Sequence, residues 1–161
     1  MSALTIPPTS PVELVAMSAG GAHFGVPVMR VRDVLDTPVI YPVPLAPAAI
    51  VGSINLRGRI VTAIDLRTRL GMPAREQGGR CMSVIVERAK EPAGEPYALL
   101  VDEVGEVLTL PPSAFDPNPV TLSKDWASVC LGLFRREKSL LLLLDVDPLL
   151  ESVQTAERRA A

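Results

Sequence analysis

Aromatic residues and long apolar runs are both scarce in this chain of 161 residues. Phe, Trp and Tyr make up 4% of the sequence although 48% of it is hydrophobic, so the core has to be built mainly from Val, Leu, Ile and Ala. The longest apolar runs, such as Leu140 to Leu144, are far too short to cross a bilayer. The N-terminus lacks the basic and apolar regions of a signal peptide. We therefore expect a cytoplasmic protein with no membrane insertion.

An excess of charge of one sign is also missing, since the formal net charge is −2. Nucleic-acid binding calls for clustered Lys and Arg and for aromatic side chains that stack on bases, and both are lacking here. Cys81 and Cys130 lie far apart without C-x-x-C spacing, which favours reduced core thiols in a cytosolic protein. The single histidine, His23, has no companion ligand nearby in the sequence. The sequence therefore predicts neither a metal site nor a cofactor.

Prolines separate short apolar segments throughout the chain and exclude long helices over most of it. The segments between them alternate apolar and polar residues or are continuously apolar, as strands do. We therefore predict a mainly β fold with short helices, with strands at residues 12–16, 24–28, 82–86 and 97–101.

An internal repeat divides the chain into two related parts. Residues 24–38 (FGVPVMRVRDVLDTP) align with residues 97–111 (YALLVDEVGEVLTLP) at a constant offset of 73, which places Asp33 on Glu106. Residues 60–70 (IVTAIDLRTRL) resemble residues 140–150 (LLLLLDVDPLL) at an offset of 80. In each part a hairpin precedes an apolar strand, and Asp65 or Asp145 then caps a helical turn. We expect two similar β-subdomains that share one core, because neither part could bury enough apolar surface alone.

Catalytic motifs such as G-x-S-x-G, a P-loop or H-E-x-x-H are absent from the sequence. Paired carboxylates leave one enzymatic alternative, a small β-barrel metal-dependent hydrolase that uses Asp102, Asp145 and Asp147. Capping and turn roles compete with this interpretation, because these acids lie at strand ends and Pro148 favours a helix start. A small-ligand or nucleic-acid module on the same kind of barrel is a third class, and the slightly negative charge and the few aromatic residues count against nucleic acid.

The most polar hairpin is Asn55-Leu-Arg-Gly58, within residues 51–71 (VGSINLRGRIVTAIDLRTRLG). On spacing alone it is a tight turn in which Gly58 takes a positive φ and Arg57 points into water. The alternative is a rigid hairpin on which Asn55 and Arg57 organise a surface, with Arg57 bound to a carboxylate.

The same stretch closely resembles the signature of the CheW-like family of chemotaxis coupling proteins, G-x-x-N-L-R-G followed by D-L-R before a small helix. Residues 24–35 (FGVPVMRVRDVL), 97–112 (YALLVDEVGEVLTLPP) and 131–150 (LGLFRREKSLLLLLDVDPLL) resemble further family segments. The resemblance implies two five-stranded SH3-like β-barrel subdomains around a common apolar core. The resemblance covers almost the whole chain, so we expect a single domain of two intertwined β-subdomains over residues 12–152. The proline-rich start predicts a flexible tail at 1–11, and the polar C-terminal residues predict a polar end at 153–161.

The family resemblance implies an adaptor without catalytic activity or cofactor. Such an adaptor joins the regulatory domain of a CheA-like histidine kinase to the cytoplasmic tip of methyl-accepting chemotaxis receptors, and we expect a stand-alone adaptor here. Carried onto this sequence, the partner-binding residues are Val31, Asp33, Gly52, Ile54, Asn55, Arg57 and Gly58. An acid in the family pairs with the arginine that matches Arg57; here that acid is Asp33, one methylene shorter than the usual Glu. Thr62-Ala63 also replaces the usual Pro-Val.

Overall fold

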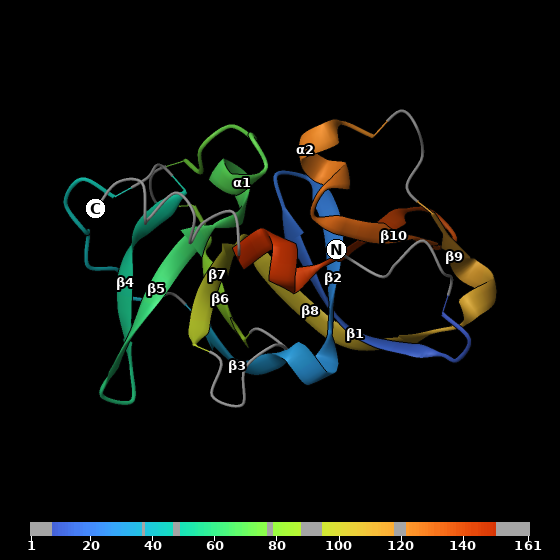
Figure 1. Cartoon of the computed structure of the whole chain (residues 1–161), viewed down its shortest axis with the longest axis horizontal. Coiled ribbons are helices and arrows are strands. Elements are labelled where there is room, and N and C mark those ends of the chain that lie inside the picture. Colours follow the sequence, from blue (N-terminus) through green and yellow to red (C-terminus); the bar gives the residue numbers. More distant parts are fainter. Residues whose placement is uncertain are drawn as a thin grey trace.

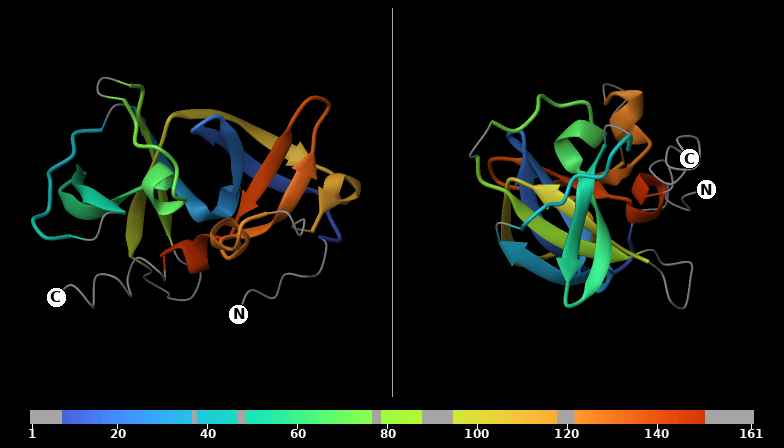
Figure 2. Two further views of the ribbon diagram at one scale, coloured as in Figure 1. Left: turned by 90° about the horizontal axis from the view of Figure 1, so that it is seen from above. Right: turned by 90° about the vertical axis from the view of Figure 1, so that its left-hand side faces the viewer.

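The computed structural model describes residues 8–36, 38–46, 49–76, 79–87, 95–117 and 122–150. Most of the predicted N-terminal tail (residues 1–7) and the whole predicted polar end (153–161) lie outside the described residues. Two β-sheets lie side by side along the long axis of the molecule, with short helices beside them (Figures 1 and 2). No helix among the described residues has the length and apolar character needed to cross a membrane.

The first sheet contains six strands in the order β8-β1-β2-β11-β10-β9. Its strands are antiparallel except for β2 and β11, which run parallel. Figure 1 shows this sheet on the right. The bounds are β1 Val12–Ala19, β2 Ala22–Pro27, β8 Glu103–Leu110, β9 Phe115–Asp116, β10 Cys130–Arg135 and β11 Leu140–Leu144.

The second sheet contains five strands in the order β3-β6-β7-β5-β4, and here β5 and β7 are the parallel pair. Its bounds are β3 Val31–Asp36, β4 Ile50–Leu56, β5 Arg59–Asp65, β6 Met82–Glu87 and β7 Pro96–Val101. The helical elements are short: η1 Val28–Arg30, α1 Leu66–Arg69, η2 Pro112–Ala114, α2 Lys124–Ala127 and a last turn at residues 146–150.

The mainly β class, the two subdomains and the short helices are as the sequence predicts. The strand counts are six and five rather than five each, because the two-residue strand β9 extends the first sheet beyond β10. The barrels are not closed by backbone pairing. Within the described residues, β8 and β9 are the edges of one sheet and β3 and β4 the edges of the other.

The two halves of the chain exchange strands. After β2 the chain leaves the six-stranded sheet, and β3, β4 and β5 join the other; after β7 it returns as β8 to β11. Each sheet therefore combines a hairpin from one half with strands from the other half. The registers are equivalent, since Phe24 lies opposite Leu142 and Tyr97 lies opposite Thr62, at the offsets of 73 and 80 seen in the sequence. The repeat thus describes a two-fold internal symmetry.

A β-bulge marks the same place in both halves. The register shifts between Ile50 and Gly52 in one sheet and between Cys130 and Gly132 in the other. A Cβ on Gly52 would collide with the carbonyl oxygen of Tyr41, and one on Gly132 with the ring of Phe115. Both glycines therefore allow a neighbouring segment to approach the backbone closely.

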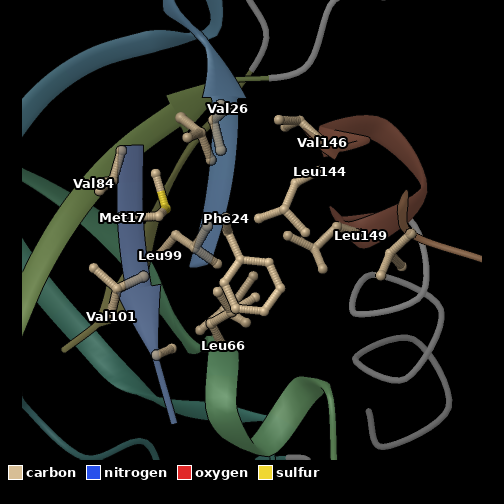
Figure 3. Close-up of a cluster of buried hydrophobic side chains, with 14 of the residues drawn as sticks. Met17, Phe24, Val26, Leu66, Val84, Leu99, Val101, Leu144, Val146 and Leu149 are labelled. Carbon is tan, nitrogen blue, oxygen red and sulfur yellow. The ribbon is translucent and has the colours of Figure 1, made fainter. Parts of the chain in front are cut away.

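Three apolar clusters fill the molecule. The largest lies between the sheets and includes Phe24 and Leu99, the side chains around which Figure 3 is centred. In the same figure Val146 and Leu149, from the last helical turn, face the strands. Each sheet also encloses a smaller cluster of its own, one around Ile54 and one around Phe134. The shared central cluster confirms that the two halves bury their apolar surface together.

Candidate functional site

The β4–β5 hairpin carries the polar residues that the sequence singles out. Leu56 pairs with Arg59, so Arg57 and Gly58 form a two-residue loop. Both have positive φ, 51° and 87°, which is the type I′ turn that matches the twist of paired strands. The Asn55 side-chain oxygen accepts the Gly58 N–H at 2.8 Å. Gly58 and Asn55 therefore hold Arg57 at the tip in a conformation that a non-glycine residue rarely adopts.

Arg57 and Asp33 form an ion pair, with 3.0 Å between Nη2 and Oδ2. The other Asp33 oxygen accepts the Val34 N–H at 2.8 Å, which orients the carboxylate. Asp33 lies on β3 and Arg57 on the hairpin of β4, so the pair joins the two edges of the five-stranded sheet through side chains. The shorter arm of aspartate is thus long enough to reach the arginine. We call this Asp33–Arg57 pair the clasp.

The clasp is an exposed interaction on the arginine side. The side chain of Arg57 is 83% exposed and that of Asp33 27%. Ion pairs with this much solvent contribute about 0–1 kcal/mol to stability. The clasp therefore contributes little to the stability of the fold.

The structure separates the other predicted site residues into surface and interior. Val31 is half-buried and lies opposite Val86, at the start of the strand that carries Asp33. Ile54 is 1% exposed in the cluster inside the five-stranded sheet. Gly52 is buried at the bulge beneath Tyr41. Ile54 and Gly52 can therefore shape this surface only from within the fold.

Two of the three carboxylates of the enzymatic alternative, Asp102 and Asp147, form ion pairs with arginines. Asp102 accepts Arg67 Nε at 3.0 Å and Nη2 at 2.7 Å, as well as Arg75 and the Gly20 N–H at 2.9 Å. Burial alone would raise the pKa of Asp102, but these hydrogen bonds outweigh it and hold the pKa below its usual range. Asp147 pairs with Arg30 at 2.9 Å.

The capping expectation holds in detail for Asp65, whose side chain accepts the Arg67 N–H at the start of α1. Asp145 precedes the helical turn at residues 146–150 in the same way. The described residues contain no group of three His, Cys, Asp or Glu side chains that could hold a metal ion.

Sequence reasoning missed the arginines that bind these acids. Arg75 Nη1 lies 3.0 Å from Asp65 Oδ2, and its Nη2 lies 3.1 Å from Asp102 Oδ1. Arg75 follows α1 in an irregular segment with no periodicity, so no local signal marks it. Arg67 stood within the D-L-R motif, but its partner is 35 residues away.

The cysteines differ in burial. Cys130 is buried at the start of β10, where burial raises the pKa of its thiol to about 12. Cys81 is half-buried, and burial also raises the pKa of its thiol. Neither thiol is therefore activated as a nucleophile at neutral pH.

Comparison with known proteins places this geometry in a family. The model of the CheW-like domain matches residues 13–154. This chain belongs to the CheW-like family.

CheW proteins of several bacteria are similar to it along most of their length. The chemotaxis protein CheW of Rhizobium meliloti is 33% identical over 149 residues, covering 92% of each chain. The CheW of Thermotoga maritima is 32% identical over 128 residues, covering 80% of each. The crystal structure of the scaffolding protein TtCheW from Thermoanaerobacter tengcongensis superposes with a TM-score of 0.76 at 26% identity, covering 88% of this chain and 93% of that one.

Membership of the CheW-like family confirms the function that the sequence predicts. The protein is a non-catalytic chemotaxis adaptor of the kind that couples receptors to CheA. The metal-dependent hydrolase is thereby set aside, and the roles of Asp102 and Asp147 are those of ion-pair partners for arginines.

Proposed function

We propose that the clasp side of the five-stranded sheet binds the cytoplasmic tip of a methyl-accepting receptor. The residues assigned to this surface are Val31, Asp33, Asn55, Arg57 and Gly58 on its outside, with Gly52 and Ile54 shaping it from within.

The observation that carries this proposal is the clasp itself. A guanidinium that is 83% exposed is held on a type I′ turn and oriented by a carboxylate, so it is positioned at little cost in stability. Two exposed apolar side chains lie close to the clasp residues in the sequence: Ile60 on β5, opposite Asn55, is 73% exposed, and Met29 in η1, four residues before Asp33, is 84% exposed. An apolar edge with one fixed polar group suits the apolar face of a receptor helix.

We assign the regulatory domain of a CheA-like kinase to the six-stranded subdomain. The β10–β11 hairpin there is the symmetry counterpart of β4–β5 but has different chemistry. An open hollow adjoins this hairpin, lined by Leu110, Pro111, Ala114 and residues 135–139. A second, chemically distinct face lets one small protein hold two partners and raise their effective concentration.

The adaptor would act in the cytoplasm by binding alone. It would need no cofactor, contact no nucleic acid and insert nowhere in the membrane, in keeping with a net charge of −2 and few aromatic residues.

The test is a co-sedimentation assay with receptor-containing membranes and CheA from the same cells. Arg57→Ala should weaken receptor binding about tenfold and leave kinase binding within about twofold, because the clasp lies on one subdomain only. Arg136→Ala is the matched control for receptor binding, which it should leave unchanged, since Arg136 is an exposed arginine on the counterpart hairpin; its kinase binding is not used as a control because Arg136 lines the hollow assigned to the kinase. Receptor binding retained at wild-type level by Arg57→Ala would refute the assignment.

A further inference from the structure

The chain crosses between the two sheets twice, and a charged residue lies at each crossing. Arg30 ends η1, between β2 of the six-stranded sheet and β3 of the five-stranded sheet. Asp102 lies between β7 and β8, where the chain returns. The two crossings are related by the internal symmetry, but their charges are opposite.

The first crossing binds two groups of the second half. Arg30 Nη1 donates to the Glu87 carbonyl oxygen at 2.9 Å, at the end of β6. Its Nη2 donates to Asp147 Oδ2 at 2.9 Å. We call this arrangement the first pin.

The second crossing binds the equivalent groups of the first half. The Asp102 backbone N–H donates to the Ser18 carbonyl oxygen at 2.9 Å, near the end of β1. Its carboxylate accepts Arg67 Nη2 at 2.7 Å and is supported by Arg75 and the Gly20 N–H. We call this the second pin.

The two pins match at their hairpin and turn positions, whereas their crossing residues are one position apart, since at the offset of 73 Arg30 corresponds to Glu103 and Asp102 to Met29. Ser18 and Glu87 occupy the same place in the two exchanged hairpins, opposite His23 and Pro96. Arg67 and Asp147 each come two residues after the aspartate that precedes a helical turn. One pin therefore has arginine at the crossing and aspartate on the turn, and the other pin has the reverse.

We propose that this reversed polarity selects the exchanged arrangement of the two halves over one in which each half closes on itself. If the first half closed alone, the crossing that carries Arg30 would meet the turn that carries Arg67. If the second half closed alone, Asp102 would meet Asp147. Both meetings bring like charges together, whereas the native exchange brings opposite charges together twice.

Apolar packing discriminates only weakly between the exchanged and the self-closed arrangements. The pairing registers of the two halves are the same, so β2 could lie along β5 in the register in which it lies along β11. The strands concerned are apolar on both sides of the exchange, which leaves competing arrangements close in energy. Like charges that meet in the self-closed arrangement raise its energy above that of the native exchange.

The charges of the two pins are partly buried, which strengthens their interactions. The side chains of Arg30, Asp147, Arg67 and Asp102 are only 19–21% exposed. Partly buried charges are screened less than surface charges, and an unpaired one is costly. The ion pair of the clasp is screened more strongly by solvent, because Arg57 is 83% exposed.

The test compares refolding of full-length variants from denaturant, with Trp126 fluorescence and the monomer peak in gel filtration as measures of native recovery. Trp126 is the only tryptophan, and its ring packs against Phe24 of the other half at 5.7 Å. The central variant is Arg30→Asp with Asp147→Arg. It keeps an ion pair in the native fold, but the new charges would now attract Arg67 and Asp102 in self-closed halves.

The expected order of native recovery is wild type, then Arg30→Ala with Asp147→Ala, then the reversed pair, with the reversed pair about twofold or more below wild type. The control is Asp33→Arg with Arg57→Asp, which reverses the clasp. Both clasp residues belong to the first half and meet in either arrangement, so recovery should equal that of wild type. This test does not depend on partner binding.

Two results would overturn the proposal. One is a reversed pair that refolds as completely as wild type. The other is an alanine pair that recovers no better than the reversed pair, since the loss would then come from missing contacts and not from polarity. A reversed pair that accumulates no native protein, while the alanine pair and the reversed clasp fold, supports it.

Discussion

The β4–β5 and β10–β11 hairpins occupy equivalent places in the two sheets and differ at their tips. In both, two residues form the loop: Arg57-Gly58 between Leu56 and Arg59, and Glu137-Lys138 between Arg136 and Ser139. The first loop has positive φ at both residues. Among the described residues, Arg57 and Leu45 are the only non-glycine residues with positive φ, so the second loop has a different turn type.

The charges at the tips also differ. The clasp pairs Arg57 with Asp33, whereas the equivalent positions in the other half hold Glu137 and Glu106, two acids. The two halves therefore share one backbone arrangement, and a few exposed residues give their hairpin tips different charges.

The largest expected effect comes from substituting the bulge glycines, because both halves need a neighbouring segment to approach the backbone closely there. Gly52→Ala and Gly132→Ala should each lower the free energy of unfolding by about 2–4 kcal/mol, because the new Cβ meets backbone or ring atoms that cannot move aside. Urea denaturation measures this. Gly105→Ala is the control, since its nearest contact would be an ordinary 3.6 Å. A stable Gly52→Ala protein would show that the approach is dispensable.

Acid should weaken the crossing that carries Asp102. The pKa of Asp102 is held below its usual range, so its ion pairs stabilise the fold above the unfolded-state pKa of about 4 and this contribution is lost as the pH falls through the lower folded-state pKa. Unfolding measured between pH 7 and pH 2 should therefore show less pH dependence in Asp102→Asn than in wild type. Identical slopes would contradict the pairing.

The smallest effect sharpens the comparison of the loops. Gly58→Ala should cost about 1 kcal/mol, because alanine disfavours a φ of 87° although no atom lies within 4 Å of the new Cβ. Lys138→Ala at the equivalent position should change stability by less than about 0.5 kcal/mol. Equal melting shifts in the two variants would mean that the turn types do not differ in solution.

Much of the fold was predictable because local signals and global packing agree. The residue types of the strands and the prolines between them indicate a mainly β chain, and Asp65 caps α1 as expected. The repeat predicted two related units with a shared core, which the central cluster confirms. The clasp hairpin followed from N-L-R-G, since Gly58 and Asn55 suit a tight turn.

Other features could not be predicted from the sequence. The exchange of strands between the halves depends on pairings such as β2 with β11, which lie more than a hundred residues apart. Hydrophobic periodicity is a local signal and does not indicate which distant strands pair. The same is true of Arg75, whose partners Asp65 and Asp102 come from two other segments. Ile54 was predicted as a partner-binding residue, and its 1% exposure results from packing in the apolar cluster of the five-stranded sheet.

The sequence by itself determined the element types, the duplication and the polar hairpin, because propensity, turn chemistry and alternation act over a few residues. The tertiary structure alone decided which half each strand joins, which acids meet which arginines and how far each side chain is buried. These depend on distances across the folded chain, where charges such as Arg30 and Asp147 meet although 117 residues separate them.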